Sequence, residues 1–294
     1  MDLPFPSAAQ ANTSPFCLIR PDLRTAPLVF ASPHSGRDYP AEFVAAARLD
    51  AIGLRRSEDS FVDELFEAAP AHGAPLLAAN FPRAFCDPNR EAWELDPAMF
   101  EDKLPTWVNT SSARVGAGLG TIARVVALGE SIYRDKLPFS EAERRIRDYW
   151  QPYHDCLTAL VDETRTLFGA SLLIDCHSMP AYGSTPSGAS GGVDFVLGDV
   201  FGTTCAPGVT RRVEQILTDL GYVVRRNDPY AGGFVTRHYG RPREAMHALQ
   251  IEIARGLYMN EARIERASGF SAVQADLTRL VAILSREAAQ LLTD

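Results

Sequence analysis

The chain has few lysines, no paired cysteines and no long apolar run. Its lysines are Lys103 and Lys136, and all its other basic residues are arginines, which weakens any mechanism that needs a Schiff-base or phosphate-loop lysine. Its five cysteines are scattered without a CxxC pair, so we expect no disulfide framework and a reducing cytoplasm. No segment is long and apolar enough to cross a bilayer, and the first residues lack the basic-then-apolar order of a signal peptide.

An excess of positive charge is also absent. The 294 residues carry a formal net charge of −8, which argues against nonspecific binding to nucleic acid or to an anionic membrane surface. Hydrophobic residues make up 46% of the chain and charged residues 22%, as in ordinary globular proteins. We find no repeat and no linker that would divide the chain. We therefore predict a single domain over residues 1–294, present as a monomer or a small homo-oligomer.

Apolar, β-favouring runs alternate along the chain with segments of helical periodicity. This order favours an α/β fold whose largely parallel sheet is covered by helices on both faces. The predicted strands cover residues 28–34, 75–81, 171–177, 194–198, 222–226 and 248–254. The predicted helices cover residues 41–51, 59–69, 140–168, 203–220 and 272–292, the third opening with a capping box of Ser140 and Glu143. The Gly/Ser-rich segment 183–192 predicts a loop.

Two histidines stand at the ends of predicted strands. His34 ends the run LVFASPH and His177 ends the run SLLIDCH. In open α/β sheets, ligands collect beyond the carboxyl ends of the strands, and neutral imidazole is a common zinc ligand. Two imidazoles at that edge indicate a metal site. The alternative for each histidine is a hydrogen-bonded residue at the rim of the sheet.

A catalytic zinc usually has three protein ligands and an open position for water. The third ligand is expected among the carboxylates of RSEDSFVDELF, which are Glu58, Asp59 and Asp63. Asp59 stands at the expected first turn of a helix, where its side chain can turn toward the strand ends, so we favour it, with Glu58 next. Asp63, one turn later, is either a partner of a ligand or part of a solvated face.

Glu252 is an unusual carboxylate because it lies in the otherwise apolar predicted strand ALQIEIA. A glutamate in such a strand is costly unless it is paired or has a function. The functional interpretation is a general base whose pKa is raised by partial burial and which activates a metal-bound water. The alternative is a structural salt bridge with Arg255 or another arginine.

Arginines follow two of the predicted strands. The segment NFPRAFCDPNRE carries Arg83 and the pair Asn89–Arg90, and arginine binds carboxylates through two parallel hydrogen bonds. One arginine can stabilise an oxyanion while the other binds a substrate carboxylate. Arg237 and His238 follow a Gly-Gly pair and indicate a loop that closes over substrate. Surface salt bridges, or a simple polar connection, are the alternatives.

Two further motifs resemble known signatures without their structural context. The glycines at 116, 118 and 120 follow a poor strand and have GxGxG spacing instead of GxGxxG. The GxSxG match at 188–192 lies in a predicted loop and lacks a preceding strand. A nucleotide-dependent oxidoreductase built on the first motif remains an alternative function, as does a noncatalytic metal- or ligand-binding protein.

Taken together, the motifs resemble those of the N-formylglutamate amidohydrolases, also called N-formylglutamate deformylases. The similar segments are SPHSGRDYP, EDSFVDELF, NFPRAFCDPNR, GLGTIARVVALGESIYR, DCHSMP, GGFVTRHYG and ALQIEIARGLYM. They extend in order from about residue 32 to residue 259 and include the glycines of the nucleotide-like motif. The resemblance implies a three-layer α/β/α fold with a mostly parallel, mixed central sheet, as in zinc exopeptidases and phosphorylase/hydrolase-like proteins.

The resemblance also implies roles for individual residues. His34 and His177 would be ligands of one zinc ion, Glu252 the general base, and Asn89 with Arg90 the clamp for a substrate carboxylate. The implied reaction is hydrolysis of N-formyl-L-glutamate, or a similar small anionic N-acyl amino acid, to the free amino acid and formate, as in histidine degradation. A related N-acyl amino acid amidohydrolase or a carboxypeptidase-like metallohydrolase is the alternative.

Two positions depart from the wider family pattern. The carboxypeptidase HxxE motif has Arg37 in place of its glutamate, so the third ligand must come from Asp59 or Glu58. Pro88 replaces a larger apolar residue in the clamp segment and is expected to alter the clamp slightly. Arg83 would polarise the substrate carbonyl.

Overall fold

The structure is a computed structural model that describes residues 14–126, 129–181 and 192–293. Its internal contacts divide the chain into two units. Unit 1 comprises the described residues up to Cys17, Pro33–Ser60 and Ala79–Cys156. Unit 2 comprises Leu18–Ser32, Phe61–Ala78 and the described residues from Leu157 onward. The loop and the GxSxG match predicted between residues 183 and 192 lie outside the described residues, apart from Gly192.

The described residues form a seven-stranded sheet in the order β1-β3-β2-β4-β7-β5-β6. Its strands are β1 (Phe16–Ile19), β2 (Leu28–Ser32), β3 (Leu76–Ala79), β4 (Ser171–Met179), β5 (Phe195–Gly198), β6 (Val224–Arg226) and β7 (Met246–Ala254). Strand β2 pairs in parallel with β3 and β4, β4 with β7, and β5 with β6, whereas β5 and β7 are antiparallel. The predicted mostly parallel, mixed sheet is confirmed.

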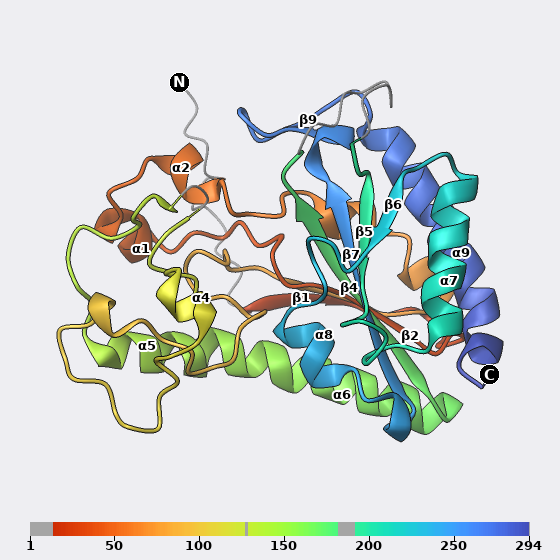
Figure 1. Ribbon diagram of the computed structural model, residues 1–294, viewed down its shortest axis with the longest axis horizontal. Helices are drawn as coiled ribbons and strands as arrows, with labels where there is room; N and C mark the ends of the chain where they lie inside the picture. Colours follow the sequence, from red (N-terminus) through yellow and green to blue (C-terminus); the bar gives the residue numbers. More distant parts are fainter. Residues whose placement is uncertain (1–13, 127–128, 182–191, 294) are drawn as a thin grey trace. The chain divides into compact units, whose positions relative to one another are not determined.

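The centre of the sheet consists of β2, β4 and β7, whose residues are all buried. Strands covered on both faces need near-continuous apolar runs, which explains why these three were recognisable in the sequence. In unit 2, helices α7 (Pro207–Asp219) and α9 (Phe270–Leu291) lie on one side of the sheet, and α8 (Phe234–Tyr239) and the end of α6 (Gln151–Phe168) lie on the other (Figure 1). This arrangement gives the predicted three layers.

Two predicted helices were wrong in extent. The segment 41–51 forms α1 (Ala41–Ala46) and α2 (Ala51–Arg55), because the backbone becomes extended at Ala47 and Asp50 caps a new helix by accepting a hydrogen bond from Gly53 N at 2.7 Å.

The segment 59–69 contains only α3 (Val62–Leu65). Phe61, immediately before this helix, has a left-handed backbone with φ of 67°. The left-handed region interrupts a right-handed helix. Asp59 therefore lies in a connecting segment before the helix and not in its first turn.

The long predicted helix 140–168 is continuous but not uniform. It consists of α5 (Phe139–Arg145), one π-helical turn (Ile146–Trp150) and α6. The predicted capping box was wrong: Pro138 is the N-cap, and the first helical N–H, on Phe139, donates to Asp102 Oδ2 at 2.7 Å. An aspartate distant in sequence thus replaces the expected local cap.

The remaining elements are short. They are α4 (Ala113–Gly116), β8 (Met259–Asn260), β9 (Glu265–Arg266), and 3₁₀ turns at Pro70–His72, Pro97–Met99, Pro242–Glu244 and Arg255–Leu257. The loop expected after the Gly-Gly pair is instead the helix α8. Within the described part of the chain, none of the helices has the length and apolarity that a membrane span requires.

Candidate active site

In unit 1, His34 lies just beyond β2 with both ring nitrogens directed at carboxylates. Its Nε2 is 2.7 Å from Asp87 Oδ1, and its Nδ1 is 3.4 Å from Asp59 Oδ2. The backbone contributes as well, because Asp59 N donates to the His34 carbonyl at 3.0 Å. All three residues are buried. The structure therefore brings together His34 and the favoured third ligand, and it adds Asp87, which the sequence analysis did not single out.

Gly36 explains how the turn after His34 reaches the segment that carries Asp87. A Cβ at this position would lie 2.1 Å from the carbonyl oxygen of Phe81, so the close approach of the two backbones requires glycine. Asp38 N also donates to the carbonyl of Asn80 at 2.8 Å. The SPHSG motif thus serves to dock His34 onto the segment 80–87.

Asp87 is the charge centre of this cluster. Arg83 Nη2 donates to its Oδ2 at 2.8 Å, Asn89 N donates to its Oδ1 at 2.8 Å, and Arg90 Nη2 lies 3.9 Å from Oδ2. Burial alone would raise the pKa of Asp87, but Arg83, His34 and Arg90 together hold this pKa well below its usual value. Asp87 is therefore ionised. The sequence signal was its place between two arginines in the motif NFPRAFCDPNR.

Glu58, the other candidate for third ligand, has a separate set of partners. Arg55 binds its carboxylate from Nε at 2.9 Å and from Nη2 at 2.8 Å. Ser60 Oγ donates to it at 2.7 Å and Tyr39 OH at 3.1 Å. A carboxylate held by three side chains is a structural group at this position, and the geometry favours Asp59 over Glu58.

The spacing of His34 and Asp59 is compatible with two ligands of one metal ion. A separation of 3.4 Å between Nδ1 and Oδ2 is long for a hydrogen bond. Two ligand atoms on one tetrahedral zinc ion lie about 3.3–3.5 Å apart, given the usual zinc–ligand distances. Burial and the nearby Arg83 lower the pKa of His34, which favours the neutral imidazole that a metal requires.

In unit 2, His177 and Glu252 stand side by side on adjacent parallel strands. The register of β4 and β7 pairs His177 with Glu252 and Asp175 with Gln250. His177 Nε2 lies 2.8 Å from Asp175 Oδ1, and Gln250 Nε2 donates to Glu252 Oε1 at 2.8 Å. The sequence analysis missed Asp175 and Gln250. Their signal was the same as that of Glu252, a polar residue within an apolar strand.

Glu252 is 7% exposed. Arg255, which the sequence analysis named as a possible salt-bridge partner of Glu252, donates from Nε to Ser178 Oγ at 3.1 Å and has Nη1 3.7 Å from Glu261. Glu252 has the burial that we expected of a general base, and the amide of Gln250 donates to its Oε1.

Arg90 is held rigidly in unit 1. Its Nε donates to the carbonyl of Leu119 at 2.8 Å and its Nη1 to the carbonyl of Asn89 at 2.8 Å. Burial lowers the pKa of Arg90 to about 10, so the guanidinium remains charged near neutral pH. These carbonyls bind Nε and Nη1 of Arg90 but not Nη2. A charged guanidinium fixed in this way is suited to binding a carboxylate.

The π-helical turn supports the backbone around Arg90. Trp150, the last residue of this turn, donates from Nε1 to the Arg90 carbonyl at 3.0 Å. One turn later, His154 Nε2 lies 2.8 Å from the Pro88 carbonyl. The π turn thus ends at the first of two ring side chains, Trp150 and His154, that bind backbone carbonyls of the clamp segment. Such π turns often occur at functional sites.

Arg237 and His238 lie on α8, and both are exposed. The His238 ring stacks on Phe234 with the ring centroids 5.0 Å apart. The described contacts do not join either residue to His177 or Glu252, so their role in binding substrate stays a prediction. The same short helix also carries Thr236, which is fully buried and hydrogen-bonded to Asp175, and which the sequence analysis missed.

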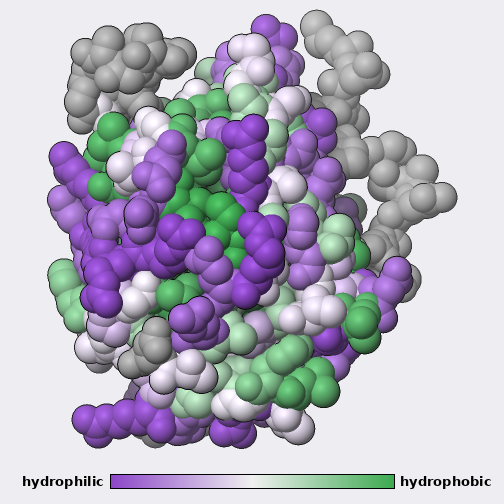
Figure 2. Space-filling model, turned by 90° about the vertical axis from the view of Figure 1, so that its right-hand side faces the viewer, coloured by the Kyte–Doolittle hydropathy of each residue, from purple (hydrophilic) through white to green (hydrophobic). Residues whose placement is uncertain are grey.

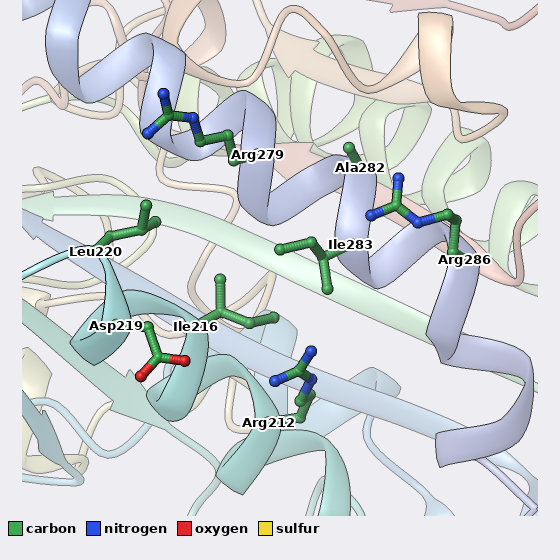
Figure 3. A pocket seen from close by; sticks show the side chains of 8 residues that line it. All are labelled: Arg212, Ile216, Asp219, Leu220, Arg279, Ala282, Ile283 and Arg286. Atoms are coloured by element: carbon green, nitrogen blue, oxygen red, sulfur yellow. The ribbon is translucent and has the colours of Figure 1, made fainter.

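A pocket lies between α7 and α9 in unit 2, and none of the candidate site residues lines it. Its volume is about 430 Å³, and its wall combines the apolar side chains of Ile216 and Ile283 with three arginines (Figure 3). The same side of the molecule shows an apolar patch bordered by hydrophilic residues (Figure 2). Arg212 is paired with Glu287 and Arg279 with Asp276, so two of the three arginines are paired with carboxylates.

The fold and the two clusters define an α/β protein with buried histidine–aspartate pairs and a buried glutamate at its strand ends. The chain belongs to the N-formylglutamate amidohydrolase family, whose model matches residues 26–259. The resemblance that the motifs indicated is therefore confirmed.

Similar proteins agree with this assignment. The N-formylglutamate deformylase of Pseudomonas putida is 30% identical over 244 residues, covering 80% of this chain and 82% of that protein. The N-formylglutamate deformylase of Pseudomonas aeruginosa is 31% identical over 260 residues, covering 87% and 89%.

Solved structures extend the comparison to the fold. The crystal structure of N-formylglutamate amidohydrolase from Ralstonia eutropha JMP134 has a TM-score of 0.87 and 42% sequence identity, covering 94% of this chain and 99% of that one. A gene product of Agrobacterium tumefaciens has a TM-score of 0.63 at 18% identity, covering 93% and 96%, and shows the fold alone.

Proposed function

We propose that the protein is a zinc-dependent amidohydrolase that cleaves N-formyl-L-glutamate to formate and L-glutamate. The observation that carries the proposal is that both strand-end histidines use Nε2 to bind a buried aspartate, His34 to Asp87 and His177 to Asp175. Histidine ligands of metals characteristically bind a carboxylate through one ring nitrogen and the metal through the other. Family membership and the names of the related proteins support the substrate.

The proposed zinc ligands are His34, Asp59 and His177, each bound through one atom. Among the described histidines, cysteines, aspartates and glutamates, these three buried residues form a group that could hold a metal ion. Two nitrogens and one carboxylate oxygen are donors that zinc accepts in catalytic sites.

The proposed reaction divides its tasks among the residues of the two clusters. A bound zinc would supply Lewis acidity and lower the pKa of a coordinated water to about 7. Glu252 accepts a proton from the attacking water and returns it to the leaving amine, as a carboxylate acting as general base does. Arg83, held by Asp87, donates to the developing oxyanion.

Substrate recognition is assigned to the clamp segment and to α8. Asn89 and Arg90 bind one carboxylate of the substrate, and Arg237 with His238 binds the other. Because Arg90 is already fixed by two backbone carbonyls, little side-chain entropy is lost when a carboxylate binds to it.

Formate release from N-formyl-L-glutamate tests the proposal directly. We expect formate from the purified protein, loss of activity after chelation, and its return when zinc is added. N-Acetyl-L-glutamate and an N-formyl amino acid without a second carboxylate are the matched controls. A folded, zinc-loaded protein that releases no formate contradicts the assigned substrate and favours the alternative N-acyl amino acid amidohydrolase. Zinc binding without hydrolysis of any acyl amino acid favours the noncatalytic binding protein.

A further inference from the structure

Five buried side chains of unit 2 form one hydrogen-bonded network, here called the Thr236 network. His177 Nε2 lies 2.8 Å from Asp175 Oδ1, and Thr236 Oγ1 lies 2.9 Å from Asp175 Oδ2 and 3.4 Å from Gln250 Oε1. Gln250 Nε2 then donates to Glu252 Oε1 at 2.8 Å. Thr236 and Asp175 are 0% exposed, and Glu252 is the most exposed member at 7%. The network joins a proposed zinc ligand to the proposed base.

The strand register explains why these residues meet. Alternate residues of a strand share one face, so Asp175 and His177 lie on one face of β4, and Gln250 and Glu252 lie on one face of β7. Asp175 pairs with Gln250, and His177 pairs with Glu252 two residues further along the strands. The pair of His177 and Glu252 carries the proposed chemistry. Thr236 of α8 contacts both members of the other pair, Asp175 and Gln250.

The direction of each hydrogen bond follows from its partners. Gly233 N, at the N-cap of α8, donates to Gln250 Oε1 at 2.8 Å. The amide of Gln250 must therefore direct its NH₂ group at Glu252, because a backbone N–H can only donate. Thr236 shares its one hydroxyl proton between two acceptors, with the shorter and stronger contact to Asp175 Oδ2 and the longer one to Gln250 Oε1.

Because Thr236 is fully buried, the presence of its hydroxyl group needs an explanation. Valine has nearly the same shape as threonine and would fill a fully buried helix position without bringing a polar atom into the interior. A buried hydroxyl is tolerated only when its hydrogen bonds compensate for the loss of water. Here those bonds reach the aspartate that holds His177 and the amide that holds Glu252.

We infer that Thr236 is a positioning residue that, through Asp175 and Gln250, sets the orientations of His177 and Glu252 together. The inference rests on the proposed function for its catalytic readout. Asp175 fixes the ring of His177 by binding Nε2, so Nδ1 is the nitrogen that would bind a metal ion. Gln250 fixes one oxygen of Glu252, which limits the rotation of the carboxylate. Residues that orient metal ligands in this way typically contribute about 10- to 100-fold to metal affinity or activity.

The test compares Thr236→Val with Thr236→Ser. Thr236→Val keeps the shape and removes the hydroxyl, and we expect kcat for N-formyl-L-glutamate and the affinity for zinc each to fall about 10- to 100-fold. KM should stay within about twofold, because Asn89 and Arg90 belong to unit 1 and the substitution leaves the side chains of Arg237 and His238 on α8 unchanged. Thr236→Ser keeps the hydroxyl and should restore both quantities to within about threefold of the wild type. Zinc affinity is measured by competition with a chromophoric chelator.

Thr158→Val is the matched control. Thr158 Oγ1 lies 3.1 Å from Tyr239 OH on the same helix α8, so its loss removes a hydroxyl contact to the helix without touching the network. We expect no change in kcat or zinc affinity. Equal losses in Thr236→Val and Thr236→Ser would show that side-chain packing matters and would overturn the inference, as would wild-type values in Thr236→Val.

Gln250→Met tests the contact between Gln250 and Glu252 and serves if Thr236→Val does not fold. It keeps the length of the side chain, adds no charge and removes the amide that donates to Glu252. We expect kcat to fall at least about tenfold with zinc affinity within about threefold, and an unchanged kcat would overturn the inference. A wild type that binds zinc but releases no formate would refute the proposed function alone, since the zinc competition still decides between Thr236→Val and Thr236→Ser.

Discussion

The two histidine–aspartate pairs have the same geometry but opposite surroundings. In unit 1, Asp87 accepts from Arg83 and lies near Arg90, so its charge is compensated by cations. In unit 2, Asp175 accepts from the neutral hydroxyl of Thr236, and within the described residues no arginine or lysine pairs with it. One pair is held by charge and the other by a buried network of mostly neutral groups.

The difference indicates a division of labour. The arginines that hold Asp87 are also those proposed to bind the substrate and the oxyanion, so the proposal assigns substrate recognition to the charges of unit 1. The groups that hold Asp175 lead to Glu252, so the proposal assigns proton transfer to the network of unit 2. Changes in unit 1 should therefore appear mainly in KM and in salt dependence, and changes in unit 2 mainly in kcat.

The largest effect is expected for Glu252→Gln. The amide keeps the size of the side chain but cannot accept the proton of the attacking water, so kcat should fall at least about 100-fold, the scale of general-base catalysis. Zinc content, measured by elemental analysis, should not change. Glu244→Gln, which alters an exposed glutamate, is the control. Near-normal turnover in Glu252→Gln would show that Glu252 is not the general base.

The two aspartates should differ in what their loss does to stability. Asp87→Asn leaves two guanidinium groups without their carboxylate, and we expect the free energy of unfolding to fall by about 3 kcal/mol. Asp175→Asn removes no partner of a cation, and we expect a loss of about 1.5 kcal/mol, the value of a hydrogen bond to a charged group.

Urea unfolding of the metal-free variants measures both values. The metal must be absent, because its binding to the folded state would add stability that grows with the logarithm of its affinity. An equal loss in the two variants would mean that the cations around Asp87 do not distinguish the pairs.

The sequence predicted the parts of the structure that depend on buried strands. The apolar runs of β2, β4 and β7 identified the central sheet and placed both histidines at its edge. Glu252 was recognisable because one charged residue interrupts an apolar strand. Asp175 carries the same signal within SLLIDCH but stands beside a more conspicuous histidine.

The sequence could not predict features that depend on contacts between distant segments. The left-handed backbone of Phe61 shortens the helix after Asp59, and Asp102 replaces a local cap at Phe139. The bond between Thr236 and Asp175 joins residues 61 positions apart. Such partners are chosen by tertiary packing, which no local pattern records.

Arg90→Lys should have a smaller and different effect. Lysine keeps the charge but loses the planar fork and the bonds to two backbone carbonyls. We expect kcat/KM for N-formyl-L-glutamate to fall about tenfold, the equivalent of one charged hydrogen bond, mainly through KM. Arg20→Lys, at an exposed pair with Glu163, is the control and should change nothing. Full kcat/KM in Arg90→Lys would place the clamp elsewhere.

The smallest effect is expected from a change in salt concentration, which should alter KM through unit 1 but leave the effect of substitutions in unit 2 unchanged. The proposed substrate is a dianion and the whole protein carries a net charge of −8, so in the proposed mechanism binding depends on local arginines that outweigh the overall field. The Debye length falls from about 30 Å at 0.01 M salt to about 3 Å at 1 M, and we expect KM to rise about two- to fivefold over this range. The ratio of kcat between wild type and Thr236→Val should stay constant, because that network is buried and screened little. A KM that does not respond to salt would contradict the arginine clamp. A kcat ratio that does respond to salt would mean that the network around Asp175 is not the neutral counterpart of the charged groups around Asp87.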